Sequence, residues 1–211
     1  MFDVGETLID ETRIWSRWAD RLGVSRLTFL GVLGGMAALD RPHTDAFELV
    51  RPGIDLAGEM RRWAADDPGG LRENFDADDL YPDVRGALAG LRELGLMVVV
   101  AGNQPPQAKA ALQAMALPVD AIFTSAQWAV EKPDPAFYRK VAEVCGEPVG
   151  HILYVGDRLD NDVLAAGKAG MRTALLRRGP WGFLHAQRPE ASRADLVIDD
   201  LFELVEKVAA L

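Results

Sequence analysis

The second half of this chain alternates short apolar runs with segments of helical character, and this alternation restricts the possible folds more than any other feature. The apolar runs have the length and composition of buried parallel strands and lie at residues 97–101, 121–124, 151–155, 173–176 and 196–198. The helical segments lie at residues 82–94, 106–115, 135–145, 160–169 and 201–210. Repeated strand–helix units predict an α/β fold, a doubly wound parallel sheet with helices on both faces.

Residues 9–79 differ from the second half, because their apolar side chains recur at three- and four-residue steps. Trp15, Trp18 and Leu22 follow this helical spacing, and no stretch of the region has the pattern of a strand. Gly and Pro residues divide the region into about four helices, with breaks at residues 34–35, 41–42, 51–53 and 67–70. We therefore expect an α/β core formed by residues 1–8 and 80–211, and an all-helical domain at residues 9–79.

The charge and the cysteine content exclude several classes of function. The chain has 211 residues and a formal net charge of −9, whereas binding to a nucleic-acid backbone needs clustered Lys and Arg. Cys145 is the only cysteine, so no disulfide can form within the chain, as expected in a reducing cytoplasm. No signal-peptide pattern is present, and no apolar run approaches the roughly 20 residues of a membrane span. We expect a cytoplasmic protein without nucleic-acid or membrane partners; the sequence does not indicate its oligomeric state.

Residues suited to chemistry follow the predicted strands. Four segments carry them, namely residues 2–8, 98–103, 131–135 and 154–162. Their notable residues are, in the same order, Asp3, the pair Gly102 and Asn103, Lys132, and the pair Asp157 and Asp162. Ligands on a doubly wound sheet bind beyond the carboxyl ends of its strands, so we expect the four segments to meet in one site.

Three of these side chains have the chemistry of a metal-assisted attack on phosphorus. A carboxylate such as Asp3 can attack a phosphoryl group and form an aspartyl-phosphate. Because an anion attacks an anionic group, a counter-charge is needed, and Asp157 and Asp162 offer the hard oxygen ligands that Mg²⁺ prefers. Other interpretations stay open at this point. The two aspartates can cap the following helix instead, Lys132 can be a solvated loop lysine, and Asp3 can be a surface acid.

The order and spacing of the four segments resemble those of the haloacid dehalogenase-like (HAD) hydrolase superfamily. The resemblance rests on the motifs FDVGETL at residues 2–8, KPDP at 132–135 and GDRLDND at 156–162, with a helical domain inserted directly after the first motif. It covers nearly the whole chain. It implies a Rossmann-like HAD core with a helical cap domain, and Mg²⁺ as the cofactor.

The resemblance also implies a role for each residue of the motifs. Asp3 would be the nucleophile and a metal ligand together with Asp157 and Asp162, and the backbone carbonyl of Gly5 would be a further ligand. Lys132 would neutralise the nucleophile and a phosphoryl oxygen. Three further residues would hold the phosphoryl group, namely Thr7, Gly102 and Asn103.

The chain departs from the superfamily pattern in the first motif. Phosphatases of the superfamily usually carry a second aspartate two residues after the nucleophile, which protonates the leaving group and then activates water. Gly5 occupies this position and can do neither. Loss of a general acid–base group costs about 10²–10⁴ in rate. Glu6 is the next residue and could substitute for this acid, although its expected direction from the backbone does not suit the role.

Two further departures concern Gly102 and the first strand. Most relatives have a Ser or Thr at the position of Gly102, whose hydroxyl holds the phosphoryl group, so backbone N–H groups and the nearby amide of Asn103 are expected to replace it. Only Met1 and Phe2 precede Asp3, whereas a buried parallel strand has about five or six residues. Either the true start lies upstream or the first strand is unusually short.

These observations favour a Mg²⁺-dependent hydrolase of small phosphorylated metabolites, slow or restricted to good leaving groups such as acyl and aryl phosphates. An alternative is a catalytically impaired relative that binds phosphate or a partner without turnover. A 2-haloacid dehalogenase would use the same aspartate on carbon without a metal, but the spacing of Asp157 and Asp162 is of the metal-binding type. Phosphonatases need a lysine in the cap, and residues 9–79 contain none.

The cap is expected to close over the site and to determine the choice of substrate. Four arginines on or near its first helix can clamp a carboxylate or a second phosphate, or can simply be solvated: Arg13, Arg17, Arg21 and Arg26. Residues 177–182 follow a strand and are expected to form a loop at the edge of the site.

Overall fold

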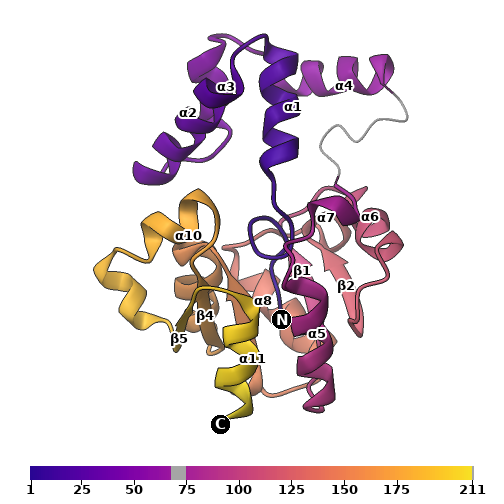
Figure 1. Ribbon diagram of the computed structural model, residues 1–211, viewed down its shortest axis with the longest axis vertical. Helices are drawn as coiled ribbons and strands as arrows, with labels where there is room; N and C mark the ends of the chain where they lie inside the picture. Colours follow the sequence, from indigo (N-terminus) through magenta and orange to yellow (C-terminus); the bar gives the residue numbers. More distant parts are fainter. Residues whose placement is uncertain (68–74, 211) are drawn as a thin grey trace. The chain divides into compact units, whose positions relative to one another are not determined.

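The computed structural model describes residues 1–67 and 75–210. Contacts between residues divide the chain into two compact units (Figure 1), each described here by itself. The core unit comprises Met1–Asp10 and Asp76–Leu211, and the cap unit comprises Glu11–Phe75. These bounds lie a few residues from the predicted ones, because Ile9 and Asp10 pair with Leu80 and Asp79 of the core unit.

The core unit contains a parallel sheet, which confirms the predicted fold class. Its strands in the described residues are β1 (Val99–Gly102), β2 (Ala121–Thr124), β3 (Leu153–Gly156), β4 (Arg172–Leu176) and β5 (Leu196–Ile198). They form two parallel groups, β1 with β2 and β3 with β4 and β5. The first residues of the chain join the groups, because Phe2 forms parallel bridges to Val100 of β1 and to Val155 of β3. The order across the sheet is therefore β2, β1, the first segment, β3, β4 and β5.

The first segment is short but bonded on both sides. The amide of Phe2 donates to the carbonyl of Val99 at 2.9 Å, and the amide of Asp3 donates to the carbonyl of Val155 at 2.9 Å. In return, Ala101 donates to the carbonyl of Phe2 at 2.9 Å. Asp3 therefore stands between the ends of β1 and β3, in the middle of the sheet.

Helices cover both faces of the sheet, with α5 and α11 in front and α8 behind in the view of Figure 1. The bounds of the longer core helices are α5 (Val84–Glu93), α6 (Ala108–Ala114), α8 (Pro135–Cys145) and α11 (Leu201–Ala209). Gly86 and Gly90 let α11 approach α5 closely, because a Cβ on Gly86 would lie 2.9 Å from the ring of Phe202. On the other face, Phe137 and Tyr138 of α8 pack in one apolar cluster with Tyr154 of β3.

The helix predicted at residues 160–169 is present, but it consists of a π-helix, η3 (Leu159–Ala165), followed by the short helix α9 (Ala166–Lys168). A second prediction was wrong. Residues 177–182 were expected to form a loop, but helix α10 (Gly179–His185) begins there, with Pro180 in its first turn and Trp181 buried. Short elements complete the core: η1 (Ala77–Asp79), α7 (Ser125–Trp128), η2 (Val149–His151) and η4 (Pro189–Arg193).

The described part of the cap unit is all helical. Its helices are α1 (Thr12–Leu22), α2 (Arg26–Ala38), α3 (Asp45–Val50) and α4 (Leu56–Asp66). Gly23 ends α1 in the left-handed conformation, and the side chain of Ser25 caps α2. Edge-to-face aromatic contacts form its interior: the rings of Trp18 and Phe47 and those of Trp18 and Trp63 lie 4.8 Å apart. The predicted break at residues 67–70 falls mostly outside the described residues.

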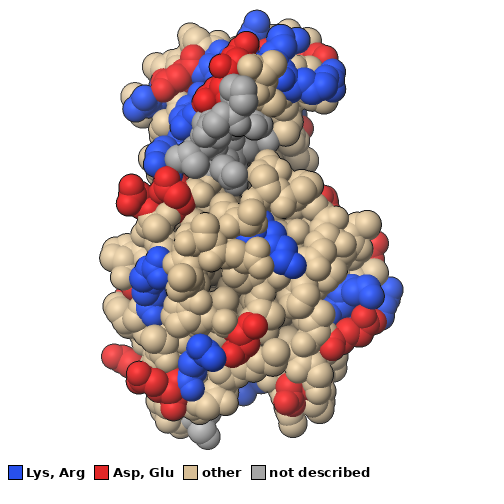
Figure 2. All heavy atoms as spheres, turned by 90° about the vertical axis from the view of Figure 1, so that its right-hand side faces the viewer, with Lys and Arg blue, Asp and Glu red and all other residues tan. Residues whose placement is uncertain are grey.

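The surface carries charges of both signs. In Figure 2 basic and acidic side chains are interspersed over the face in view. Among the described residues, no helix is both long enough and apolar enough to cross a membrane.

Candidate active site

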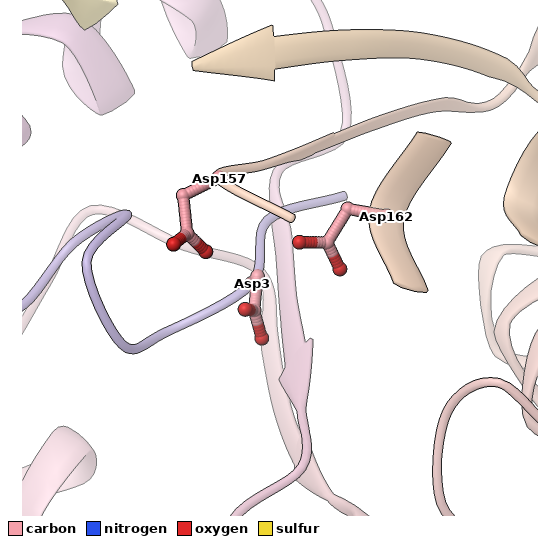
Figure 3. Close-up of side chains that lie close together, drawn as sticks. All are labelled: Asp3, Asp157 and Asp162. Atoms are coloured by element: carbon pink, nitrogen blue, oxygen red, sulfur yellow. The ribbon is translucent and has the colours of Figure 1, made fainter. Parts of the chain in front are cut away.

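Three carboxylates converge at the carboxyl ends of the central strands of the core unit. Oxygen atoms of Asp3, Asp157 and Asp162 lie within 4.8 Å of one another, and all three residues are buried. Figure 3 shows the three carboxylates facing a common space. Asp3 ends the first segment, Asp157 directly follows β3, and Asp162 lies in the π-helix η3. Asp3 is therefore a buried residue of the cluster and not a surface acid.

The local structure after β3 explains how Asp162 reaches this cluster. A side chain on Gly156 would collide with the carboxylate of Asp162, so the absence of a Cβ there leaves room for it. One oxygen of Asp162 accepts a hydrogen bond from the amide of Arg158 at 3.0 Å. Asp162 thus stabilises the start of η3, as a capping residue does, while its carboxylate remains in the cluster.

Lys132 supplies a positive charge inside the cluster. Its Nζ lies 2.8 Å from Oδ1 of Asp3 and 2.6 Å from Oδ1 of Asp162. The side chain is 2% exposed, which rules out a solvated loop lysine. The ring of Tyr154 lies beneath the ammonium, with its centroid 5.2 Å from Nζ. The ammonium therefore bridges the proposed nucleophile and one of the proposed metal ligands.

Burial and mutual repulsion raise the proton affinity of the cluster. Burial raises the pKa of Asp157 well above its usual range, and the charges of Asp162 and Asp3 raise it further. Burial also raises the pKa of Asp162, to about 6, although Lys132 opposes this shift. Burial alone would lower the pKa of Lys132, but Asp162 and Asp3 outweigh it and raise that pKa. Together, three acids and one ammonium make a buried site that favours an additional cation.

Of the residues predicted to hold a phosphoryl group, Gly102 lies directly against the carboxylate of Asp3. A Cβ on Gly102 would collide with Oδ1 of Asp3, so the carboxylate uses the space that a Ser or Thr side chain would fill. Thr7 is fully buried, and its hydroxyl has no hydrogen-bond partner among the described residues. The amide side chain of Asn103 is bonded at both of its polar atoms to the main chain of Lys132, at 2.9 and 2.7 Å.

The turn after Asp3 has a glycine where the general acid would stand and a buried glutamate beside it. Gly5 has no side chain to offer a proton. Glu6 has a left-handed backbone conformation with φ 47°, and its carboxylate accepts a hydrogen bond from the hydroxyl of Tyr81 at 2.6 Å. A Cβ on Gly179 would lie 2.6 Å from Cγ of Glu6, so this side chain passes close over the start of α10. The charge of Glu6 contributes to the raised pKa of Asp157.

With this geometry established, comparison with known proteins places the chain in a family. Residues 1–170 match the family model of haloacid dehalogenase-like hydrolases. The chain belongs to this family. The resemblance seen in the sequence is thereby confirmed. Phosphatases of the HAD family generally use a divalent metal ion.

Curated relatives of this HAD-family chain include several phosphatases. The chain is 34% identical over 137 residues to the glyceraldehyde 3-phosphate phosphatase of Methanopyrus kandleri, covering 62% of this chain and 57% of that protein. It is 32% identical over 133 residues to the phosphoglycolate phosphatase of Pseudomonas fluorescens, covering 60% and 46%. With the phosphoserine phosphatase of Thermus thermophilus it shares 28% identity over 200 residues, covering 89% and 76%. The chain thus spans about half the length of the first two relatives.

Solved HAD structures resemble the chain along nearly its whole length. The L-2-haloacid dehalogenase of Xanthobacter autotrophicus with chloropropionic acid covalently bound has a TM-score of 0.66 at 22% identity, covering 100% of this chain and 97% of that one. The HAD phosphatase of Thermococcus onnurineus has a TM-score of 0.60 at 22% identity, covering 98% and 95%. At these identities the likeness establishes the shared fold.

The sequence patterns did not predict a buried network of hydrogen bonds that supports the first motif. The guanidinium of Arg178 donates to the carbonyl of Thr7 at 2.8 Å and forms an ion pair with Asp83 at 2.5 Å. It also lies over the ring of Tyr81, 4.0 Å from the centroid. The contact of Arg178 with the first motif could not be predicted, because residues 177–182 were expected to form a loop and only the fold brings Arg178 next to Thr7.

The cap arginines were considered as clamps for a substrate, and three of them form ion pairs within the cap. Arg17 pairs with Asp67 at 3.1 Å, Arg21 with Glu59 at 2.7 Å, and Arg26 with Asp20 at 2.7 Å. Arg17 and Arg21 also lie over the ring of Trp63, each 5.8 Å from its centroid. These three arginines are therefore paired with acids of the cap itself.

Proposed function

We propose that this HAD hydrolase is a Mg²⁺-dependent phosphatase of small phosphorylated metabolites that works through an aspartyl-phosphate at Asp3. The observation that carries the proposal is the buried cluster in which Asp3 lies beside Asp157, Asp162 and the ammonium of Lys132. The phosphatase names of the curated relatives support the same class of substrate. The single cysteine, Cys145, supports a cytoplasmic location.

The residues of the cluster fit a divalent cation. Its donors are carboxylate oxygens, which are the ligands that Mg²⁺ prefers, and they are buried close together with one ammonium for three acids. We propose that Asp3, Asp157, Asp162 and the backbone carbonyl of Gly5 hold the ion. When bound, it would supply counter-charge and polarise the phosphoryl group.

The chemistry proposed for the protein's own residues consists of two displacements at phosphorus. First, an oxygen of Asp3 bonds to phosphorus while the bond to the leaving oxygen breaks and its electron pair departs with that oxygen. Water then attacks phosphorus, the bond to Asp3 breaks, and the proton of the water passes to solvent. Lys132 offsets negative charge on Asp3 and on the phosphoryl oxygens, while Thr7 and the backbone at Gly102 orient the group.

Gly5 limits the leaving groups that this scheme can process. No side chain at Gly5 can protonate the departing oxygen, so that oxygen must leave as a stable anion or take its proton from water. Acyl and aryl phosphates have such leaving groups, whereas alkyl phosphates do not. We therefore propose slow turnover with a marked preference for activated phosphates.

The test is hydrolysis of an aryl phosphate and of acetyl phosphate with and without Mg²⁺, using the wild type, Asp3→Asn and a control, Asp200→Asn. Asp200 caps α11 at the exposed surface, and Asn caps helices equally well, so the control makes the same chemical change away from the site. We expect Mg²⁺-dependent hydrolysis that Asp3→Asn abolishes and Asp200→Asn retains.

Two other outcomes would contradict the proposal. Metal-dependent binding of a phosphate analogue without any hydrolysis would favour a non-catalytic relative that binds phosphate. Release of chloride from 2-chloropropionate without added metal would favour a 2-haloacid dehalogenase. The three converging carboxylates argue against the latter, because attack on carbon does not need a metal site.

A further inference from the structure

We propose that Asn103 is a positioning residue that fixes Lys132 for catalysis, and not a direct ligand of the phosphoryl group. This inference rests on the proposed phosphatase function and assigns a new role within its site. Two hydrogen bonds join the side chain of Asn103 to the main chain of Lys132. Nδ2 of Asn103 donates to the carbonyl of Lys132 at 2.9 Å, and the amide of Lys132 donates to Oδ1 of Asn103 at 2.7 Å.

The two bonds hold the main chain of Lys132 in both position and orientation. An amide side chain offers one acceptor and one donor group in a plane, and here both face the peptide groups of a single residue. Asn103 directly follows β1, whereas Lys132 lies in the loop before α8, 29 residues further along the chain. The side chain of Asn103 therefore fastens an irregular loop to the end of a central strand.

The side chain of Lys132 contacts Tyr154 of β3, which is itself hydrogen-bonded to β1. The ring of Tyr154 lies beneath its ammonium, and the hydroxyl of Tyr154 donates to the carbonyl of Ala101 in β1 at 2.7 Å. Both Tyr154 and the side chain of Lys132 are buried. Asn103 thus fixes the main chain of Lys132 at the end of β1, and Tyr154 supports its ammonium next to Asp3.

Such alignment matters because the ammonium must meet two carboxylates at once. Nζ lies 2.8 Å from Asp3 and 2.6 Å from Asp162, and a shift of the loop would lengthen one or both contacts. Misplacement of a catalytic group by about 1 Å can cost 10²-fold in rate. By contrast, a direct role in phosphate binding would require Asn103 to contribute independently of Lys132.

A double-mutant cycle separates these two roles. The variants are Asn103→Ala, Lys132→Met and the double mutant, with Gln113→Ala as an amide-removing control at the exposed surface of α6. The measurements are kcat/KM for an aryl phosphate with Mg²⁺, and calorimetric binding of inorganic phosphate with Mg²⁺. The binding measurement completes the cycle where turnover in the Lys132→Met background is too slow. Asn103→Asp, which keeps the acceptor for the amide of Lys132, replaces Asn103→Ala if that variant does not fold.

The positioning role predicts strongly non-additive effects. Asn103→Ala should lower kcat/KM by about tenfold to a hundredfold when Lys132 is present, and by less than about twofold in the Lys132→Met background. Gln113→Ala should behave as the wild type. Equal losses in both backgrounds, with an active wild type, would overturn the positioning role alone. A wild type that neither binds phosphate nor hydrolyses any activated phosphate would overturn the proposed function, and this inference with it.

Discussion

At the scale of single residues, Gly5 is the position that most limits what the proposed site can hydrolyse. The proposed nucleophile Asp3, the ammonium of Lys132 and two further acids lie close together, but the turn after Asp3 presents no proton donor at Gly5. Glu6 does not supply this proton donor in the structure, because its carboxylate accepts a hydrogen bond from the hydroxyl of Tyr81 and lies close to Gly179. The missing step is proton transfer to the leaving group.

Restoring a carboxylate at this position should broaden the range of substrates. We expect Gly5→Asp to raise kcat/KM for alkyl phosphates by about 10²-fold or more, the usual contribution of general acid–base catalysis, and to change aryl phosphates much less. The measurement is the dependence of kcat/KM on the pKa of the leaving alcohol, which should become shallower. An unchanged slope in a folded variant would show that proton transfer to the leaving group is not the limiting step.

The acids of the site could be predicted from the sequence, but the partners of several polar side chains could not. Asp3 and Asp157 directly follow strand ends, and parallel strands bring their carboxyl ends together. The partner of Asn103 depends on how a loop 29 residues away folds back, and spacing along the chain carries no signal for that.

At the scale of elements, the ends of three helices meet at one buried ion pair. Arg178 precedes α10, Asp83 precedes α5, and the amide of Leu201 at the start of α11 donates to the carboxylate of Asp83 at 2.8 Å. The side chains of Arg178 and Asp83 are 10% and 8% exposed. Because Arg178 also bonds the carbonyl of Thr7, this pair connects the helix ends to the first motif.

Removal of Arg178 should therefore destabilise the core. Arg178→Met leaves the carboxylate of Asp83 buried without its counter-charge, and such a change costs about 3–5 kcal/mol of unfolding free energy. Its neighbour gives a matched control, because Arg177 pairs with Asp199 at the surface and Arg177→Met should cost about 0–1 kcal/mol. Urea denaturation of both variants checks this. Equal stability of the two would show that the buried pair contributes no more than the surface one.

The same scale shows where sequence patterns succeed and fail. Short apolar runs predicted the strands closely, because strands that are buried on both faces of a parallel sheet have nearly continuous apolar sequences. The helix at η3 was predicted, but its π-helical hydrogen bonding was not, because the sequence pattern shows that a segment is helical and not which type of helix it forms. Helix α10 was missed because Gly179 and Pro180 usually mark a loop, whereas here they begin a helix whose Trp181 is buried.

At the scale of the whole molecule, we expect the acidic cluster to couple folding to pH and to the proposed metal ion. Burial and like charges raise the pKa of Asp157 above its unfolded value, so the folded state holds its proton more tightly. Stability from this group is therefore greatest at low pH and is lost as pH rises from about 4 through the folded pKa. The same holds for Asp162, whose folded pKa is about 6. A bound cation would offset this loss.

Asp157→Asn isolates this effect. Without divalent metal at pH 7, we expect the variant to melt several degrees above the wild type, since each kcal/mol corresponds to about 2–4 °C in a chain of this size. Mg²⁺ should raise the melting temperature of the wild type and leave the variant unchanged. Asp160→Asn should have the opposite sign without metal. Burial raises the pKa of Asp160, but the hydrogen bond and the charge of Arg158, with smaller contributions, together outweigh burial and lower this pKa. A variant less stable than the wild type at pH 7 would contradict this account of the cluster.

The most direct test of the account is to look for phosphate on Asp3 itself. Without a side chain at Gly5 to activate water, the second displacement should be slow, so the aspartyl-phosphate should accumulate from a reactive donor. The measurement is acid quenching of the protein with acetyl phosphate and Mg²⁺, followed by peptide mass spectrometry. The account predicts phosphate on the peptide that contains Asp3, dependent on Mg²⁺ and absent in Asp3→Asn. Hydrolysis that continues in Asp3→Asn, or a phosphate attached to another residue, would contradict it.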